Sequence, residues 1–313
     1  MLTSLVAHYS IRKAADLQQI SYEDLPVKCP KCGDRIHGIE LIHTDVAGRI
    51  KINHLEKRVR NLHSNGLQKF IIVLTEGTTV SGSVDDTAAV GNLIKRLQSE
   101  LKGACFYLHV DAAFGGFVLP FLSGERKYSF YVHQVDSVTI DPHKMGLTPY
   151  PAGMFIYRSN KRKNLRKLAG VREDYVPGTH GKDGTMCGSR PGASAAACWA
   201  VMKYLGPEGY QRVVDICMKN VEYMKKKLIQ FPELGLIPND MNVVSFFLKD
   251  KGNEDPLGDF RKKVKLPTHI LPVGFGDFKE PQLVYRTVVM PHVSINMINR
   301  FINRLRVELD RLK

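Results

Sequence analysis

Ser137-Val-Thr-Ile-Asp-Pro-His-Lys-Met-Gly146 is the stretch that decides both the fold class and the chemistry expected of this chain. The run from Val135 to Ile140 is rich in β-branched residues, which predicts a strand, and Asp-Pro-His-Lys ends that strand abruptly. Lys144 therefore lies at the C-terminal edge of the predicted strand, where open α/β sheets present their ligands. A lysine in this position can form a Schiff base with an aldehyde cofactor.

An acidic residue ends a second predicted strand upstream. Cys105-Phe-Tyr-Leu-His-Val110 runs into Asp111-Ala-Ala-Phe-Gly-Gly116. An acid at one strand end and a lysine at another are the pair that pyridoxal phosphate requires. The lysine holds the aldehyde carbon, and the acid keeps the ring nitrogen protonated.

Strand and helix patterns alternate through the first two thirds of the chain. Apolar residues recur at helical spacing after Asn53, a candidate N-cap, and again after Asp86 or Thr87, either of which can cap a helix. Strand patterns lie between and after these helices, at residues 70–74, 105–110, 135–140 and 153–157. The alternation predicts an α/β fold with a mostly parallel sheet and helices on its faces.

From Ala193 onward the pattern becomes helical, and Gly206-Pro207 separates two helices. The chain continues with strand patterns at 243–248 and 283–290 and an amphipathic final helix, whereas 29–38, 171–187 and 249–265 are the least regular stretches. We therefore expect an incomplete large cofactor-binding domain over residues 1–206. A bridging helix and a small α+β domain are expected over residues 207–313.

Composition limits the class of protein. Among the 313 residues, 43% are hydrophobic and 24% are charged, as in ordinary globular proteins, and no apolar run is long enough to span a membrane. The N-terminus has no signal-peptide pattern, and six scattered cysteines indicate reduced thiols, so we expect a cytoplasmic protein. The net charge of +14 lies in local clusters without interleaved aromatic residues, which favours solvated surfaces over nucleic-acid binding.

Three motifs resemble a known family. His109–Gly116, Ile140–Gly146 and Val288-Val-Met-Pro-His292 are similar to the archaeal L-tyrosine/L-aspartate decarboxylases, which are pyridoxal-phosphate group II decarboxylases. Gly188-Ser-Arg-Pro-Gly192 resembles the sphingosine-phosphate lyase branch of the same superfamily more closely. The resemblance covers nearly the whole chain from Val6. It implies the aspartate-aminotransferase type of fold (fold type I), an amino-acid substrate and a homodimer.

The resemblance assigns four residues to the cofactor ring. Lys144 matches the Schiff-base lysine, and Asp111 matches the partner of the pyridinium nitrogen. Ala113 matches the small residue under the ring. His8 matches the histidine that stacks on the other face.

Further residues match positions around the ring. Thr78 and Thr79 match threonines beside the cofactor's oxygen, and His143 matches a residue near its phosphate. Arg190 is a candidate to bind the substrate carboxylate or to position its loop, and a structural ion pair is the alternative. Tyr175, in a glycine-rich segment suited to a lid, is a candidate proton donor or an ordinary loop tyrosine.

These matches predict a carboxy-lyase that converts tyrosine, aspartate or a similar L-amino acid into an amine and carbon dioxide. One alternative is an aldehyde-lyase of the sphingosine-phosphate lyase type. Another is an inactive fragment that needs a partner chain.

Two features depart from the family's pattern. The sequence contains no Ser/Thr-Gly-Gly-Thr-Glu-Ala type loop to cradle the cofactor phosphate, so we expect an N-terminally truncated chain, with the missing part supplied by a separate chain or absent. Cys29-Pro-Lys-Cys32 resembles half of a zinc-ribbon site, with His37 and His43 as further candidate ligands. An inert loop and a redox pair are the alternatives for these cysteines.

Overall fold

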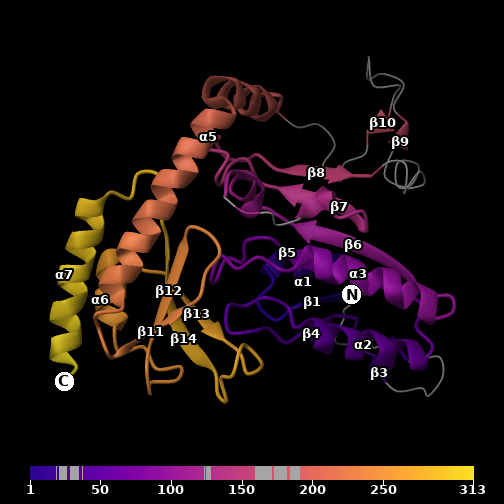
Figure 1. Cartoon of the computed structure of the whole chain (residues 1–313), viewed down its shortest axis with the longest axis horizontal. Coiled ribbons are helices and arrows are strands. Elements are labelled where there is room, and N and C mark those ends of the chain that lie inside the picture. Colours follow the sequence, from indigo (N-terminus) through magenta and orange to yellow (C-terminus); the bar gives the residue numbers. More distant parts are fainter. Residues whose placement is uncertain are drawn as a thin grey trace.

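The fold contains two sheets joined by one long helix (Figure 1). The computed structural model describes residues 1–18, 20, 38–122, 124, 128–158 and 191–313. It also gives the backbone of four two-residue strands, which pair as β2 (Val27–Lys28) with β3 (Arg35–Ile36) and β9 (Val171–Arg172) with β10 (Lys182–Asp183).

The larger sheet is mostly parallel, as the sequence predicts. Its order is β4-β1-β5-β6-β7-β8, and only β8 runs antiparallel to its neighbour. The strands are β1 (Leu2–Ser4), β4 (Glu40–Ile42), β5 (Lys69–Thr75), β6 (Cys105–Asp111), β7 (Val135–Ile140) and β8 (Met154–Tyr157).

Helices α2 (Ile52–Ser64) and α3 (Thr87–Glu100) pack on one face of this sheet. Their apolar stripes meet alternate residues of β5 and β6 in one buried core. Asp86 is the N-cap of α3, because its side chain accepts a hydrogen bond from Ala89 N. The expectation that Asn53 caps α2 is wrong: Lys51 is the N-cap, and Asn53 Oδ1 accepts from His54 N inside the first turn.

The smaller sheet is antiparallel and carries its helices on one face. Its order is β11-β12-β14-β13, and α6, α7 and the second half of α5 pack against it in a separate core. The elements are β11 (Leu234–Ile237), β12 (Val243–Leu248), α6 (Gly258–Val264), β13 (Thr268–Leu271), β14 (Gln282–Val288) and α7 (Ile295–Arg311). Helix α6 lies in a stretch for which the sequence predicts no regular structure. The helix has only seven residues, three of them consecutive basic residues, so it shows no apolar stripe.

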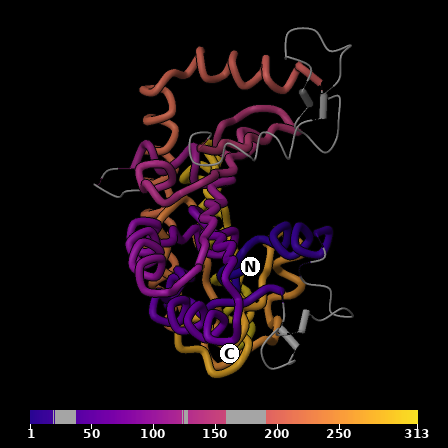
Figure 2. The backbone as a smooth tube through the Cα atoms, turned by 90° about the vertical axis from the view of Figure 1, so that its right-hand side faces the viewer, coloured from indigo at the N-terminus to yellow at the C-terminus, as the bar shows by residue number. Residues whose placement is uncertain are grey.

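Helix α5 (Ala193–Leu228) connects the two sheets and bends sharply at Gly206. Gly206 has φ 57° and ψ −176°, a conformation that favours glycine, and Pro207 cannot donate a backbone hydrogen bond. The predicted break between two helices therefore falls at the expected residues. The first half of α5 projects from the body of the molecule (Figure 2). The domain division at residue 206 stays a prediction.

Short elements complete the description: α1 (Tyr9–Leu17) and three 3-10 turns, η1 (Gly115–Phe117), η2 (Leu119–Phe121) and η3 (Ser129–Tyr131). Among the described residues, no helix has both the length and the apolar character that crossing a bilayer demands.

Candidate active site

A cavity of about 270 Å³ opens at the C-terminal ends of β5, β6 and β7. Its lining includes five of the residues that the sequence singles out: His8, Thr79, Asp111, Ala113 and Lys144. Ligands of open α/β sheets bind at this end of the strands. Segments far apart in the sequence therefore meet where a ligand is expected.

Lys144 reaches the cavity from the turn that follows β7. Its Nζ lies 3.0 Å from Asp141 Oδ2, and the side chain is partly buried. Lys144 N donates to Asp141 O, which closes the Asp-Pro-His-Lys turn on itself. The turn is joined to the end of β6, because Asp141 N donates to Ala113 O and Ala112 N donates to Thr139 O. These bonds fix the lysine relative to Asp111.

Asp111 is buried at the end of β6, where it pairs in register with Thr75 of β5 and Thr139 of β7. Its Oδ1 accepts a hydrogen bond from Ala113 N. Thr75 also lines the cavity, and its Oγ1 is buried without a hydrogen-bond partner within the described part of the chain.

His8 lies across the cavity as the N-cap of α1. Ser10 N donates to its Nδ1, so the neutral ring carries its proton on Nε2. Burial, and then the charge of Lys144, lower the pKa of His8 below its ordinary value. At neutral pH the ring is therefore uncharged and can lie against an aromatic ligand.

The two threonines of the Glu-Gly-Thr-Thr turn differ in environment. The Thr78 hydroxyl is buried and lies 3.0 Å from Ser81 Oγ and 2.9 Å from Ser83 Oγ, whereas Thr79 lines the cavity. The carbonyl of Thr79 accepts a hydrogen bond from Arg286 Nη1. The geometry thus favours Thr79 as the residue that contacts a ligand, a choice that the sequence left open.

His143 lies beside the cavity but is not among its lining residues. Its Nδ1 contacts the carbonyl of Ala152, and its ring packs edge-on against Tyr150 with centroids 4.1 Å apart. Its role near a phosphate stays a prediction. Tyr175, Arg190, Cys29, Cys32 and His37 all lie outside the described residues. Within the described residues, no group of three or more His, Cys, Asp or Glu side chains is placed to hold a metal ion.

Several residues of the cavity were not predicted. Asp141, Thr75, His109 and Thr139 line it beside the predicted residues. Burial lowers the pKa of His109, whose ring lies between the hydroxyls of Ser137 and Thr139 at 2.8 and 3.3 Å. Alternation along β6 could have indicated His109, because it faces the same side as Asp111.

Behind the cavity, a buried carboxylate joins β5 to the segment before α2. Asp85 accepts hydrogen bonds from Thr75 N and Ile50 N, and burial raises its pKa to about 7. A second buried acid, Glu76, has its pKa raised by burial and accepts from Ser129 N and Thr87 Oγ1. Tight packing holds this region: a Cβ on Gly115 would come within 2.1 Å of the carbonyl oxygen of Glu76.

The mostly parallel sheet, with Lys144 and Asp111 at neighbouring strand ends, has the fold of the pyridoxal-phosphate enzymes of fold type I. Residues 1–249 match the pyridoxal-dependent decarboxylase conserved domain, and the chain belongs to that family.

Curated relatives agree with this assignment. The chain is 32% identical over 300 residues to the probable L-tyrosine/L-aspartate decarboxylase of Methanocella arvoryzae, covering 94% of this chain and 66% of the relative. It is 38% identical over 244 residues to the L-aspartate/L-glutamate decarboxylase of Pyrococcus horikoshii, covering 76% of this chain and 58% of the relative. The chain thus spans about three fifths of the length of these relatives.

Solved structures share the fold. The glutamate decarboxylase of Lactobacillus brevis has a TM-score of 0.77 at 23% identity, over 99% of this chain and 65% of the other. The sphingosine-1-phosphate lyase of Burkholderia pseudomallei has a TM-score of 0.75 at 20% identity, over 99% of this chain and 63% of the other. At these identities the likeness concerns the fold alone.

The residues of the cavity fit the pyridoxal ring and aldehyde of pyridoxal phosphate, the cofactor of this family. They offer an amine at Lys144 and a carboxylate at Asp111. Ala113 adds only a small side chain to the wall, which leaves room for a flat ring.

Proposed function

We propose that this chain takes part in the decarboxylation of an L-amino acid to an amine and carbon dioxide. The observation that carries the proposal is the single cavity that contains His8, Asp111 and Lys144. Family membership supports the reaction class. The relatives named above suggest aspartate, tyrosine or a similar amino acid as substrate.

Each residue has a definite task in this proposal. Lys144 Nζ would hold the aldehyde carbon of the cofactor, and Asp141 contacts the lysine beside the cavity. Asp111 would keep the ring nitrogen protonated, and a protonated ring would supply the electron sink for the decarboxylation. The neutral His8 ring covers the opposite face and excludes water there.

Two further roles rest on sequence alone. Tyr175 is proposed to deliver a proton from its phenol oxygen to the substrate carbon after carbon dioxide leaves. Arg190 is proposed to bind a substrate carboxylate through its guanidinium.

Release of labelled carbon dioxide from carboxyl-labelled aspartate and tyrosine tests the reaction. We expect release with the wild-type chain and none with Lys144→Ala. Absorbance of added pyridoxal phosphate provides a second readout. If it does not change on mixing, the chain is an inactive fragment and the proposal is wrong.

A second candidate function is an aldehyde-lyase of the sphingosine-phosphate lyase type, which the Gly188-Ser-Arg-Pro-Gly192 motif favours. Release of a fatty aldehyde from a phosphorylated long-chain base, without carbon dioxide release from amino acids, would select it.

We also propose a homodimer. The half of α5 that projects in Figure 2 carries three large exposed side chains. Trp199 is 66%, Met202 47% and Tyr204 89% accessible. Large apolar side chains exposed on a projecting helix are candidates for a protein interface. Sedimentation should give a dimer that Tyr204→Glu dissociates, whereas Tyr131→Glu, at another exposed tyrosine, should leave it intact. A wild-type monomer at micromolar concentration contradicts the proposal.

A further inference from the structure

A second cavity, of about 640 Å³, lies in the helical layer of the small sheet. It is bordered by β14, α7, the end of α6 and the second half of α5, which lie side by side in Figure 1. Its floor is apolar and buried, and consists of Met224, Leu266, Val289 and Ile298. The volume is within the range of about 300–1,000 Å³ that is typical of small-molecule sites.

The rim of this cavity is basic. Lys265, Arg300 and Arg304 all line it, together with His292, and its described lining contains no Asp or Glu. Arg286 also lines the cavity, but its Nη1 donates to the carbonyl of Thr79. Arg300 and Arg304 are four residues apart on α7, so their side chains lie on the same face of the helix.

Within the described part of the chain, Lys265, Arg300 and Arg304 lack acidic partners. Nearby basic residues have acidic partners: Arg261 pairs with Asp255, and Arg311 lies 2.9 Å from Glu308. Lys265, Arg300 and Arg304 make no ion pair with any side chain in the described ranges. Like charges gathered without counterions attract an anion to the cavity.

We propose that this cavity binds an amphiphilic anion, with its apolar body on the Met224–Ile298 floor and its phosphate or carboxylate head at Arg300, Arg304 and Lys265. A guanidinium group donates two parallel hydrogen bonds to such heads, and two arginines on one helix face can share one phosphate. The apolar body gives the affinity, and the head gives the orientation. The two cavities share no lining residue, although Arg286 of this cavity donates a hydrogen bond to the carbonyl of Thr79 at the candidate active site.

Calorimetric titration of the full chain with octyl phosphate, below its micellar concentration, tests the proposal. We expect saturable binding of one molecule per chain. Inorganic phosphate, which has the head alone, and octyl glucoside, which has the chain without the charge, should each bind at least about tenfold more weakly, since a charge-assisted hydrogen bond contributes about that factor.

Two variants locate the site. Arg300→Ala combined with Arg304→Ala should weaken octyl phosphate binding about tenfold or more. Met297→Glu places a negative charge beside the cavity. The start of α7 should be preserved, because Ser294 accepts a hydrogen bond from the backbone N of residue 297 and glutamate is favoured at this position of a capping box. This substitution should weaken binding too. Lys226→Ala combined with Lys263→Ala removes two exposed charges elsewhere and should leave the affinity unchanged.

Equal affinity for octyl phosphate and octyl glucoside would overturn the proposal, and so would unchanged binding in both cavity variants. Vesicles of phosphatidylcholine with phosphatidylglycerol distinguish the source of the head group. If the chain binds the vesicles but not monomeric octyl phosphate, the basic residues make an electrostatic contact with a membrane surface. That result would refute the proposal that the cavity binds an amphiphilic anion.

Discussion

Lys144 Nζ and Asp141 Oδ2 lie 3.0 Å apart within one turn, at the edge of the cavity that Asp111 and His8 also line. The ion pair is partly buried, and both of its residues line the cavity at the ends of the strands. A lysine held in this way is positioned to react with an aldehyde, and its substitution gives the first test.

Lys144→Arg keeps a cation beside Asp141 but removes the primary amine. We expect borohydride reduction with pyridoxal phosphate to add a pyridoxyl group to the peptide that contains Lys144 in the wild type, and to leave this peptide unmodified in the variant. Mass spectrometry measures the adduct. The free energy of unfolding should change by less than about 1 kcal/mol, because the pair is partly exposed. Equal modification of another lysine would refute the assignment.

Asp111→Asn tests the buried carboxylate of the cavity. The asparagine can still accept the hydrogen bond from Ala113 N, so folding should persist while the negative charge is lost. We expect kcat/KM for decarboxylation to fall by about 100-fold or more, the effect of removing a preorganised charge from an active site. Asp86→Asn is a matched control, because Asp86 caps α3 outside the cavity and asparagine caps helices equally well.

The strand ends that carry Asp111 and Lys144 could be predicted because β6 and β7 are marked by local patterns in the sequence. Strands β1 and β4 have three residues each, too few to show a period, so their places in the sheet emerge only from pairing. The place of Thr75 at the cavity could not be predicted for a similar reason, because it depends on the register of β5 with β6, which pairs Thr75 with Asp111. Long-range contacts of this kind are set by tertiary packing and not by local propensity.

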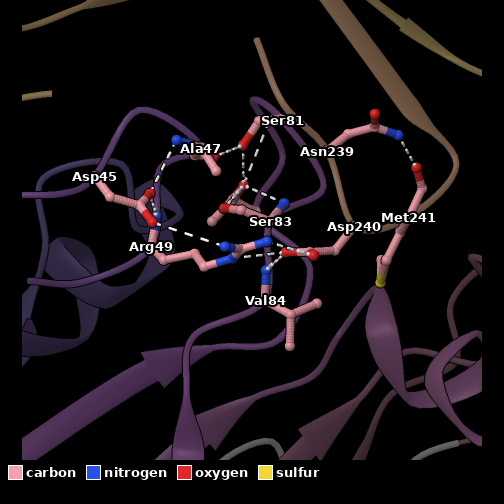
Figure 3. A network of polar contacts seen from close by, with 10 residues as sticks. Asp45, Ala47, Arg49, Ser81, Ser83, Val84, Asn239, Asp240 and Met241 are labelled. Atoms are coloured by element: carbon pink, nitrogen blue, oxygen red, sulfur yellow. Dashed lines mark hydrogen bonds and ion pairs between the residues drawn. The ribbon is translucent and has the colours of Figure 1, made fainter. Parts of the chain in front are cut away.

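The contact between Arg49 and Asp240 could not be predicted from local sequence patterns either, since the two residues are 191 positions apart in the sequence. Arg49 Nη2 lies 2.6 Å from Asp240 Oδ1, and Nε donates to Oδ2 at 3.0 Å; Oδ2 also accepts from Val84 N (Figure 3). The pair joins the loop before α2 to the segment before β12. It therefore fixes the small sheet against the large one at the level of the cavity.

Asp240→Asn should lower the free energy of unfolding by about 1–3 kcal/mol. The Asp240 side chain is only 6% exposed, so its replacement removes the charged acceptor that Arg49 and Val84 N share. Arg49 is one-third exposed and still has Asp45 Oδ2 at 3.8 Å from its Nη1, so water and Asp45 offset part of the cost. Urea denaturation measures the change. Arg49→Lys should cost less, since it keeps the charge and loses the two-point geometry. A change within experimental error for Asp240→Asn would contradict a structural role.

Asp85 predicts a pH dependence of stability. Its pKa is about 7 in the folded chain and 3.8 when unfolded, so the folded chain binds the proton more tightly. The stabilisation is complete below about pH 3.8 and is lost as the pH rises toward 7. The asparagine of Asp85→Asn keeps one acceptor oxygen, so one of the hydrogen bonds from Thr75 N and Ile50 N is lost at every pH.

Comparing the free energy of unfolding of the wild type and of Asp85→Asn at the same pH separates the effect of the Asp85 carboxyl from that of the other acidic residues. The wild type should be more stable than Asp85→Asn at pH 5, and this advantage should shrink by about 2 kcal/mol by pH 8, as expected when one shifted group loses its proton. Glu76, whose pKa is raised by burial as well, is present in both proteins and cancels to first order. Urea denaturation at each pH gives the difference. An advantage of the wild type that is constant or grows between pH 5 and pH 8 would show that the Asp85 carboxyl is already ionised throughout this window.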